Sequence, residues 1–267
     1  MINKILVALF LFFSLTVYSE PLPKPSCLKD AVDFWQDVYF KHDKDTAIIF
    51  ERNTFKVLEV VKIDVLNKDV RKMQISNLKK KYSAENVRLQ IGVKSLFLDG
   101  LDNLEKHKPF IHRELSKEGL PDFLIVLPLI ESAYDHDAVS KAGAIGLWQV
   151  MPYTARDYGV RKKKLLFDHK INTKVGIQVI KDNYRELNSW PLAITAYNHG
   201  LGGVKRGIQK LGTKDICEII QKHDGSRFGF ASKNYYASFL AAKEIYDFKK
   251  EMESFNLFSV EYFFDAN

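Results

Sequence analysis

The chain opens with an apolar stretch unlike anything that follows it. Asn3 and Lys4 give a short polar start, the run ILVALFLFFSLTV comes next, and small residues precede a cleavage point between Ser19 and Glu20. The run is too short to span a bilayer comfortably, so it predicts a secretory signal peptide over residues 1–19. An uncleaved N-terminal anchor is the alternative. No second run of spanning length follows, which predicts a periplasmic or secreted protein without an integral membrane span after signal cleavage.

Beyond this stretch, the apolar positions indicate first a helix and then a hairpin. After a proline-rich entry, the segment AVDFWQDVYF carries Phe34, Trp35, Val38 and Tyr39 at helical spacing. The segment TAIIFERNTFKVLEVVKID has β-branched and aromatic runs on both sides of residues 52–53. Two such runs around a polar turn predict a short β-hairpin.

From Ala84 onward the periodicity is helical. The segment ENVRLQIGVKSLFLDGLDNLEKH presents one apolar face, and a second helix, PFIHRELSKEGL, stops at Gly119 with Pro121 beyond it. The remainder alternates helical segments with glycine-rich turns and shows no sustained strand alternation. The pattern predicts a mainly α fold with an N-terminal helical extension that contains the short β-hairpin.

Composition and charge narrow the class of partner. The 267 residues are 46% hydrophobic and 27% charged, which is ordinary for a globular protein, and their formal net charge is +7. Removing residues 1–19 removes only the charge of Lys4 and leaves +6 (7 − 1). This balance favours anionic partners. Nucleic acid is excluded as a partner because export is expected and because no aromatic-rich basic motif surrounds the basic runs 79–81 and 161–164. We expect both runs at solvated helix ends or loops.

The chain has two cysteines, Cys27 and Cys217, in a compartment expected to be oxidising. A disulfide between them would tie the N-terminal segment to the C-terminal half. The sequence does not tell whether their Cα atoms come within bonding range, so the paired and the free states both stay open.

Three stretches in the second half concentrate polar groups. They are PLIESAYD (128–135), AGAIGLWQVMP (142–152) and ITAYNHGLGGV (194–204). In the first, Glu131 follows the apolar run FLIVL, where burial would disfavour its charged form. A glutamate on a solvated helix face is one interpretation. The other is a carboxylic acid held protonated so that it can donate its proton.

The other two stretches combine turn residues with groups that bind sugars. In the second, two glycines allow a tight turn beside a ligand, Trp148 offers a stacking face, and Gln149 offers amide donors and an acceptor. In the third, Tyr197 and Asn198 end an apolar helix just before a glycine-rich break. Each motif alone is also explained by a turn or a helix C-cap. A phosphate-binding loop is excluded because no strand precedes the glycines and the Walker pattern is absent.

In this order the stretches resemble the lytic transglycosylases with the goose-type lysozyme (SLT) fold, most closely the membrane-bound lytic murein transglycosylase D branch. The first motif matches at residues 131–132, the second at 146–149 and the third at 196–198. A fourth, a tyrosine before an LA helix, matches at Tyr235 in NYYASFLAAKEI. The resemblance covers roughly residues 110–246, about half of the chain.

The resemblance implies a mainly α, goose-type lysozyme-like catalytic domain. The expected organisation is a signal peptide (1–19), an N-terminal extension (20–108), the lysozyme-like lytic transglycosylase domain (109–250) and a C-terminal tail (251–267). The implied enzyme is a carbon–oxygen lyase that acts on peptidoglycan glycan strands. It cleaves the MurNAc–GlcNAc β-1,4 bond, forms 1,6-anhydroMurNAc ends, and needs no metal or cofactor.

A single catalytic glutamate is part of this resemblance. Most glycosidases use two carboxylates, and Asp135 and Asp137 are the nearest candidates for a partner of Glu131. The resemblance argues against both. It implies that Glu131 first protonates the glycosidic oxygen and then, as carboxylate, removes the proton from the MurNAc C6 hydroxyl, while the substrate N-acetyl group stabilises the charge at C1.

The remaining matched residues would bind substrate. Tyr235 would hydrogen-bond and orient the catalytic carboxyl, and Ser140 would lie near the C6 hydroxyl. Gln149 and Asn198 would hold the N-acetyl and hydroxyl groups, and Tyr197 would form a wall of the groove. Simpler roles exist for two of them: Ser140 as a helix cap and Tyr235 as a core aromatic.

Two positions depart from the family pattern, and two other functions remain. His136 stands where a proline is usual, and His199 where a small residue is usual. Together with His169 they are interpreted as surface or turn residues, because the histidines lack the spacing of a zinc site. The alternative functions are a hydrolytic goose-type lysozyme, in which water replaces the C6 hydroxyl, and a non-catalytic peptidoglycan-binding protein. The oligomeric state is open.

Overall fold

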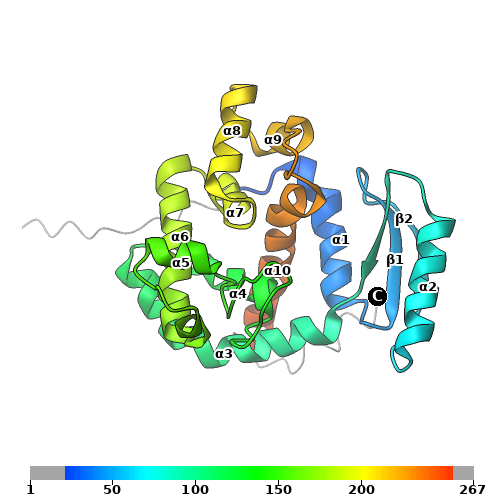
Figure 1. Ribbon diagram of the computed structural model, residues 1–267, viewed down its shortest axis with the longest axis horizontal. Helices are drawn as coiled ribbons and strands as arrows, with labels where there is room; N and C mark the ends of the chain where they lie inside the picture. Colours follow the sequence, from blue (N-terminus) through cyan, green and yellow to red (C-terminus); the bar gives the residue numbers. More distant parts are fainter. Residues whose placement is uncertain (1–21, 255–267) are drawn as a thin grey trace, which may run out of the picture.

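The computed structural model describes residues 22–254, and Figure 1 shows how their helices and strands are arranged. The predicted signal peptide (1–19) and residues 255–267 of the predicted tail lie outside the described residues. Among residues 22–254, no helix is both long enough and apolar enough to cross a membrane.

The first helix forms where the spacing predicts it and packs against the last. α1 (Lys29–Phe40) follows a short 3-10 turn, η1 (Ser26–Leu28), and lies along α10 (Phe230–Ser254), as Figure 1 shows. The buried hydroxyls of Tyr39 and Ser238 share a hydrogen bond of 2.5 Å across this interface. The N-terminal extension therefore contributes to the same hydrophobic core as the C-terminal half.

Three antiparallel strands form one sheet in the order β2-β1-β3. β1 (Thr46–Glu51) and β2 (Val57–Lys62) make the predicted hairpin, and β3 (Val87–Ile91) pairs with the other edge of β1. The prediction of helix over this last segment is wrong. Its apolar residues alternate with polar ones, a period of two, and pairing with β3 satisfies backbone groups of the buried strand β1 that would otherwise lack partners.

The two basic runs lie at the surface. α2 (Lys68–Lys81) connects β2 to β3, and the run 79–81 forms its exposed last turn. The run 161–164 is also exposed and leads into a 3-10 turn, η3 (Lys163–Phe167). Both placements confirm the prediction of solvated charges at helix ends and loops.

A single long helix replaces the two that the sequence suggests before Gly119. α3 (Lys94–Lys117) continues through Pro109, and it ends just before Gly119, which has φ +65°. Proline removes one helical hydrogen bond, but Pro109 is exposed, so water can reach the carbonyl that loses its donor. The apolar stripe of the helix is buried on both sides of the proline, and this packing keeps the helix continuous.

The C-terminal half is built from helices packed around a buried one. α7 (Trp190–His199) is buried from its first residue to Ala196 and contacts α6, α8 and α10. The remaining elements of this half are η2 (Asp122–Val126), α4 (Leu127–Ser132), α5 (Pro152–Asp157), α6 (His169–Leu187), α8 (Leu201–Leu211) and α9 (Ile216–Lys222). The prediction of a mainly α fold with a short hairpin is confirmed, and the sheet has one more strand than expected.

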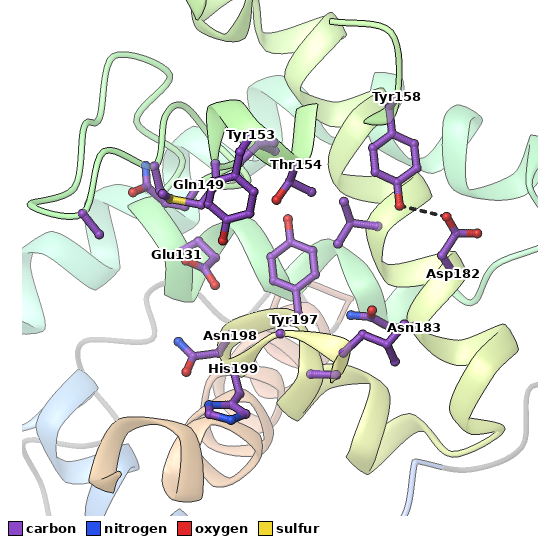
Figure 2. A pocket seen from close by; sticks show the side chains of 18 of the residues that line it. Glu131, Gln149, Tyr153, Thr154, Tyr158, Asp182, Asn183, Tyr197, Asn198 and His199 are labelled. Atoms are coloured by element: carbon purple, nitrogen blue, oxygen red, sulfur yellow. Dashed lines mark hydrogen bonds between the residues drawn. The ribbon is translucent and has the colours of Figure 1, made fainter. Parts of the chain in front are cut away.

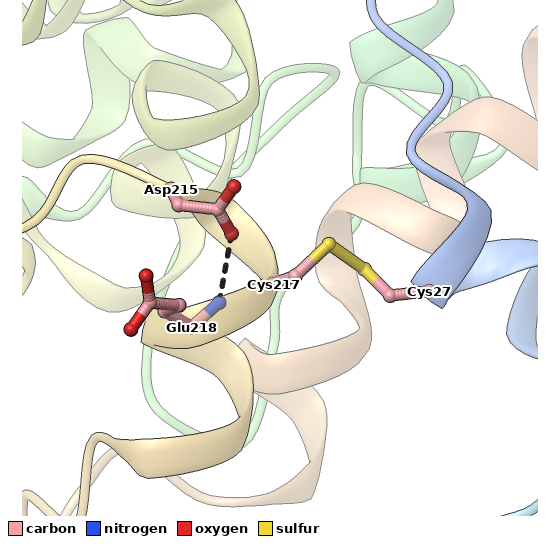
Figure 3. The surroundings of a disulfide bond; sticks show 4 residues. All are labelled: Cys27, Asp215, Cys217 and Glu218. Atoms are coloured by element: carbon pink, nitrogen blue, oxygen red, sulfur yellow. Dashed lines mark hydrogen bonds between the residues drawn. A yellow bond between two sulfur atoms is a disulfide. The ribbon is translucent and has the colours of Figure 1, made fainter.

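The two cysteines form a disulfide. Cys27 of η1 and Cys217 of α9 are joined across 190 residues of sequence, with their Cα atoms 6.1 Å apart (Figure 3). The bond fastens the segment before α1 to the helix that precedes α10, which settles the question that the sequence left open.

Candidate active site

Glu131 lies in the last turn of the short helix α4, which is held firmly in place. The preceding residues 124–127 are almost completely buried. The helix ends in two left-handed residues, Ala133 (φ 50°) and Tyr134 (φ 60°), and the buried Tyr134 hydroxyl donates a hydrogen bond of 2.6 Å to the carbonyl of Ile125. α3 approaches closely at Gly100, where an added Cβ would lie 3.0 Å from the Cα of Ala133. The backbone that carries Glu131 is therefore fixed from two sides.

The side chain of Glu131 is half-buried and accepts a hydrogen bond from Tyr235. The Tyr235 hydroxyl, on α10, donates to Oε1 of Glu131. Burial raises the pKa of Glu131 to about 7, and the hydrogen bond from Tyr235 opposes this rise. Near neutral pH a large fraction of Glu131 is thus protonated, as general-acid chemistry requires.

The loop over residues 138–150 lies beside α4 and is braced by hydrogen bonds. Ser132, the neighbour of Glu131, donates from Oγ to the carbonyl of Leu147 (2.8 Å). Ile145 and Val150 exchange backbone hydrogen bonds of 3.1 and 3.0 Å. Ser132 of the first motif therefore fastens α4 to the loop of the second motif.

Asn172 of α6 is the buried centre of this bracing. Its Nδ2 donates to the carbonyls of Ile145 (2.8 Å) and Leu166 (3.0 Å), and its Oδ1 accepts from the backbone N–H of Trp148 (2.8 Å). Two of these bonds hold the loop and the third holds η3, so only one lone pair of Oδ1 is left without a partner. Sequence reasoning missed Asn172, because a lone asparagine within a helical segment carries no local signal of this role.

The prediction that Trp148 offers a stacking face is wrong. Its side chain is 0% exposed, its Nε1 donates to Oγ1 of Thr173 (3.1 Å), and its ring lies against Gly176 of α6. A Cβ at Gly176 would lie 2.5 Å from the indole, so only glycine permits this contact. Trp148 anchors the loop in the core and leaves its neighbour Gln149, with φ 45°, at the surface of a cavity.

A cavity of about 700 Å³ brings most of the predicted site residues together (Figure 2). In the view of Figure 2, Glu131 lies between Gln149 and Asn198, with the ring of Tyr197 beside it. The predicted residues that line the cavity are Glu131, Ser140, Gln149, Tyr197 and Asn198. Tyr235 contacts Glu131 from α10. The six residues come from four separate segments of the chain and meet at one place.

Two of these side chains also shape the loop itself. Ser140 accepts from the backbone N–H of Ala144 at 3.0 Å, so it supports a turn as well as lining the cavity. Gln149 donates from Nε2 to the carbonyls of Gly146 (2.9 Å) and Ala138 (3.3 Å). These bonds occupy the amide donors of Gln149 and leave its carbonyl oxygen as the group that can accept from a ligand.

The end of α7 carries a small polar network. Tyr197 donates to the carbonyl of Trp148 (2.8 Å), which joins the third motif to the second. Ser232 of α10 donates to Oδ1 of Asn198 (3.2 Å), and Nδ1 of His199 is 3.2 Å from the same Oγ. Because the single Ser232 hydrogen goes to Asn198, His199 donates from Nδ1.

The expectation for the histidines holds only in part. His199 is half-buried, packs edge-on against Phe228 and takes part in the network at the end of α7, so it is more than a turn residue. His169 begins α6 and packs against His107. His136 is exposed as expected, with Asp135 and Asp137, and potential ligand atoms of these three residues lie within 4.8 Å of one another.

Part of the chain is similar in sequence to known proteins. Residues 108–220 match the family described as Transglycosylase SLT domain. This match covers 113 of the 267 residues, which is less than half of the chain. Membrane-bound lytic murein transglycosylase D of Escherichia coli (strain K12) is 31% identical over 121 residues, which are 43% of this chain and 26% of that protein. Membrane-bound lytic murein transglycosylase C of Histophilus somni (strain 2336) is 33% identical over 119 residues, 38% of this chain and 33% of the relative. The predicted resemblance is confirmed, although the chain spans only about a quarter to a third of these relatives' length.

Solved structures of lytic transglycosylases also align with part of the chain. The 70 kDa soluble lytic transglycosylase of Escherichia coli is 22% identical, with a TM-score of 0.47, and the alignment covers 54% of this chain and 24% of that one. Slt from Pseudomonas aeruginosa is 26% identical, with a TM-score of 0.44 over the same shares of the two chains.

The cavity is also lined by residues that the motifs did not indicate. Tyr153 and Thr154 of α5 line the cavity next to the loop, and Tyr158 donates to Asp182 of α6 (2.8 Å) on its far side. They lie outside the matched motifs, in segments whose helical pattern says nothing about which face meets a ligand. A weak signal was the position of Tyr153, four residues after Gln149.

Proposed function

We propose that this protein is a peptidoglycan lytic transglycosylase that cleaves the MurNAc–GlcNAc β-1,4 bond with Glu131 as its one catalytic carboxyl group. The observation that carries the proposal is the state of Glu131: half-buried at the wall of a cavity, hydrogen-bonded by Tyr235, with its pKa raised by desolvation to about 7. A structural glutamate has no use for this arrangement, since burying an unpaired carboxyl costs free energy that only function repays.

The first step is proton transfer to the leaving oxygen. Protonated Glu131 donates to the glycosidic oxygen, the C1–O bond breaks, and GlcNAc leaves with the proton. The positive charge at C1 of MurNAc is stabilised by the oxygen of its own N-acetyl group. A second carboxylate is then unnecessary. In support of this, no other described acidic group affects the pKa of Glu131, and both Asp135 and Asp137 are exposed.

The second step returns the enzyme to its starting state. The carboxylate of Glu131 removes the proton from the MurNAc C6 hydroxyl, and that oxygen bonds to C1 as the N-acetyl oxygen withdraws. The product is a 1,6-anhydroMurNAc end. Atoms balance without water, and Glu131 regains the proton it gave. The pKa near neutrality suits both steps, because the same group must release and accept a proton.

The other cavity residues hold the substrate. Asn198 and the carbonyl oxygen of Gln149 hydrogen-bond the N-acetyl and hydroxyl groups, and the ring of Tyr197 forms the wall beside the reacting sugar. Ser140 meets the C6 hydroxyl. Tyr235 positions Glu131 and is in place before substrate arrives, as the hydrogen bond between them indicates.

The location we propose is the periplasm or the cell exterior, after removal of residues 1–19. The disulfide Cys27–Cys217 supports an oxidising compartment. The lysozyme-like domain proposed for residues 109–250 includes the match at 108–220, and the extension 20–108 contributes α1 and the sheet to its core.

Analysis of the soluble products tests the proposal. Purified protein acting on insoluble peptidoglycan should release muropeptides that end in 1,6-anhydroMurNAc, identified by mass spectrometry. Products with only reducing MurNAc ends would mean that water attacks C1 and would favour a lysozyme. Binding without any release would favour a non-catalytic wall protein.

A further inference from the structure

A second cavity lies across the first turn of α10 from the cavity that Glu131 lines. It has a volume of about 330 Å³ and is enclosed by the turn of the β1–β2 hairpin, η1, α9 and α10. We call it the basic pocket, and its polar and charged lining residues are Arg52, Asn53, Gln221, Lys233 and Asn234. All five lie outside residues 108–220, so the match to the SLT family says nothing about them.

The basic pocket holds two cations that lack an acidic partner. Arg52 and Lys233 both line it, and neither forms an ion pair with a carboxylate within residues 22–254. Burial and the positive charge of Arg52 lower the pKa of Lys233, while Asp224 opposes this less strongly. Two like charges held close together repel each other, and an anion bound between them would relieve this repulsion.

The fold keeps these cations in place. Arg52 is fixed in the hairpin by its backbone N–H, which donates to the carbonyl of Asn86 (2.7 Å). Phe230, at the start of α10, packs against Phe55 at 6.1 Å between ring centroids and carries the guanidinium of Arg88 over its face at 4.8 Å. These contacts fix the backbone that carries Arg52 and the start of α10 before any ligand binds, which lowers the entropy cost of binding.

The disulfide forms another wall of the basic pocket. Cys27 and Cys217 both line it, and Figure 3 shows the bond spanning from η1 to α9. It fixes α9, and with it the amide of Gln221, relative to the N-terminal segment. The hairpin, the disulfide and α10 thus hold groups that donate hydrogen bonds around one small volume.

The first turn of α10 also connects the basic pocket to the proposed catalytic cavity. Ser232 hydrogen-bonds Asn198 of that cavity, and the next two residues, Lys233 and Asn234, face the basic pocket. A helix with its side chains is about 10–12 Å across, so half of its circumference is about 16–19 Å. An extended peptide spans about 3.3 Å per residue, so a peptide that starts at a sugar beside Glu131 and passes around the helix needs about five to six residues to reach the basic pocket.

We propose that the basic pocket binds a carboxylate of the peptide stem that substitutes the MurNAc residues of peptidoglycan; this choice of ligand rests on the proposed function. The guanidinium of Arg52 can donate two parallel hydrogen bonds to a carboxylate, Lys233 supplies a second charge, and Asn53 and Gln221 supply amides. The pocket would make the enzyme prefer glycan strands that still carry their stems.

A binding experiment in a non-cutting background tests this inference. The Glu131→Gln protein is mixed with intact peptidoglycan and with glycan strands stripped of stems by an amidase, and the bound fraction is measured at low and high salt. Arg52→Gln and Lys233→Gln are each added to Glu131→Gln. Lys72→Gln, which removes one exposed positive charge from α2, is the matched control.

We expect Arg52→Gln and Lys233→Gln each to weaken binding to intact peptidoglycan about tenfold, as expected for loss of a charged hydrogen bond. Binding to stripped strands should stay unchanged, and so should both affinities in Lys72→Gln. Equal weakening on both substrates, or no weakening on either, would overturn the inference. A failure of the proposed chemistry is seen separately, in the products of the wild-type protein.

Inorganic phosphate separates a stem carboxylate from other anions. In a ¹⁵N NMR titration, a free stem peptide should shift the Lys233 amide signal in the wild-type protein and not in Arg52→Gln, and at equal ionic strength phosphate should shift it much less. A larger response to phosphate than to the peptide would refute a carboxylate site.

Discussion

Removing the hydroxyl of Tyr235 gives a quantitative test of how Glu131 is tuned. Tyr235→Phe keeps the ring, which is buried, and deletes the hydrogen bond to Glu131. That bond favours the ionised carboxylate, so its loss should raise the pKa of Glu131 above about 7. A hydrogen bond to a charged group contributes roughly 1.5–3 kcal/mol, and 1.36 kcal/mol corresponds to about one pKa unit. The neutral acid also forms a weaker hydrogen bond of about 0.5–1.5 kcal/mol, so the difference between the two protonation states is about 1–1.5 kcal/mol and a rise of about one unit is expected.

The assay is the pH dependence of kcat/KM, because it reports groups of the free enzyme. Activity needs protonated Glu131, so the alkaline limb should move upward by about one pH unit in Tyr235→Phe, while maximal turnover falls because the carboxyl is less well aimed. Tyr236→Phe is the matched control: its hydroxyl donates to the carbonyl of Pro23 (2.5 Å), away from the site, so its pH profile should not move. An unchanged limb in Tyr235→Phe, or a shift in Tyr236→Phe instead, would refute the assigned roles.

Three further predictions concern stability and the loop. Glu131→Gln should abolish turnover and raise the free energy of unfolding by about 3 kcal/mol at pH 8 but not at pH 4. A folded-state pKa of about 7, above the usual 4.5, means that stability is lost as pH rises between these values. Unfolding by urea at both pH values checks this. Gly176→Ala should cost about 1–3 kcal/mol by overpacking against Trp148 and should also lower kcat, as thermal unfolding and product assays would show. Replacing Cys27 and Cys217 by serine should cost about 2–5 kcal/mol, seen as a lower urea midpoint than that of the oxidised wild type. Equal stabilisation of Glu131→Gln at both pH values would contradict the first prediction. Wild-type stability of Gly176→Ala would contradict the second, and an unchanged urea midpoint of the cysteine variant would contradict the third.

Part of the candidate site could be predicted from the sequence because it depends on local sequence patterns. Glu131 follows an uninterrupted apolar run, so its burial could be inferred, and the order of the polar stretches carried the family resemblance. The identity of Tyr235 as the residue beside Glu131 came from that resemblance, and the hydrogen bond agrees with it. The helical spacing of α1 and the polar turn of the hairpin were equally local and were predicted correctly.

The rest depended on contacts between distant residues. Trp148 has a sugar-binding composition around it, yet it is core because Gly176, 28 positions later, leaves room for its ring. β3 was taken for helix although its residues alternate with a period of two, because five residues are a weak signal beside a long helical pattern and its partner strand lies far away in the sequence. Local spacing in the sequence does not predict the disulfide between Cys27 and Cys217. It also does not predict that Arg52 and Lys233 line the same pocket.

A direct titration of Glu131 tests the central claim most sharply. In protein labelled with ¹³C at glutamate carboxyl groups, the one signal missing from Glu131→Gln identifies this residue, and its chemical shift is followed from acid to alkaline pH. The account predicts a midpoint near 7, far above the other glutamates that form ion pairs. A midpoint at the ordinary glutamate value of about 4.3 would contradict it, because Glu131 would then be ionised at neutral pH and could not serve as the acid that begins the reaction.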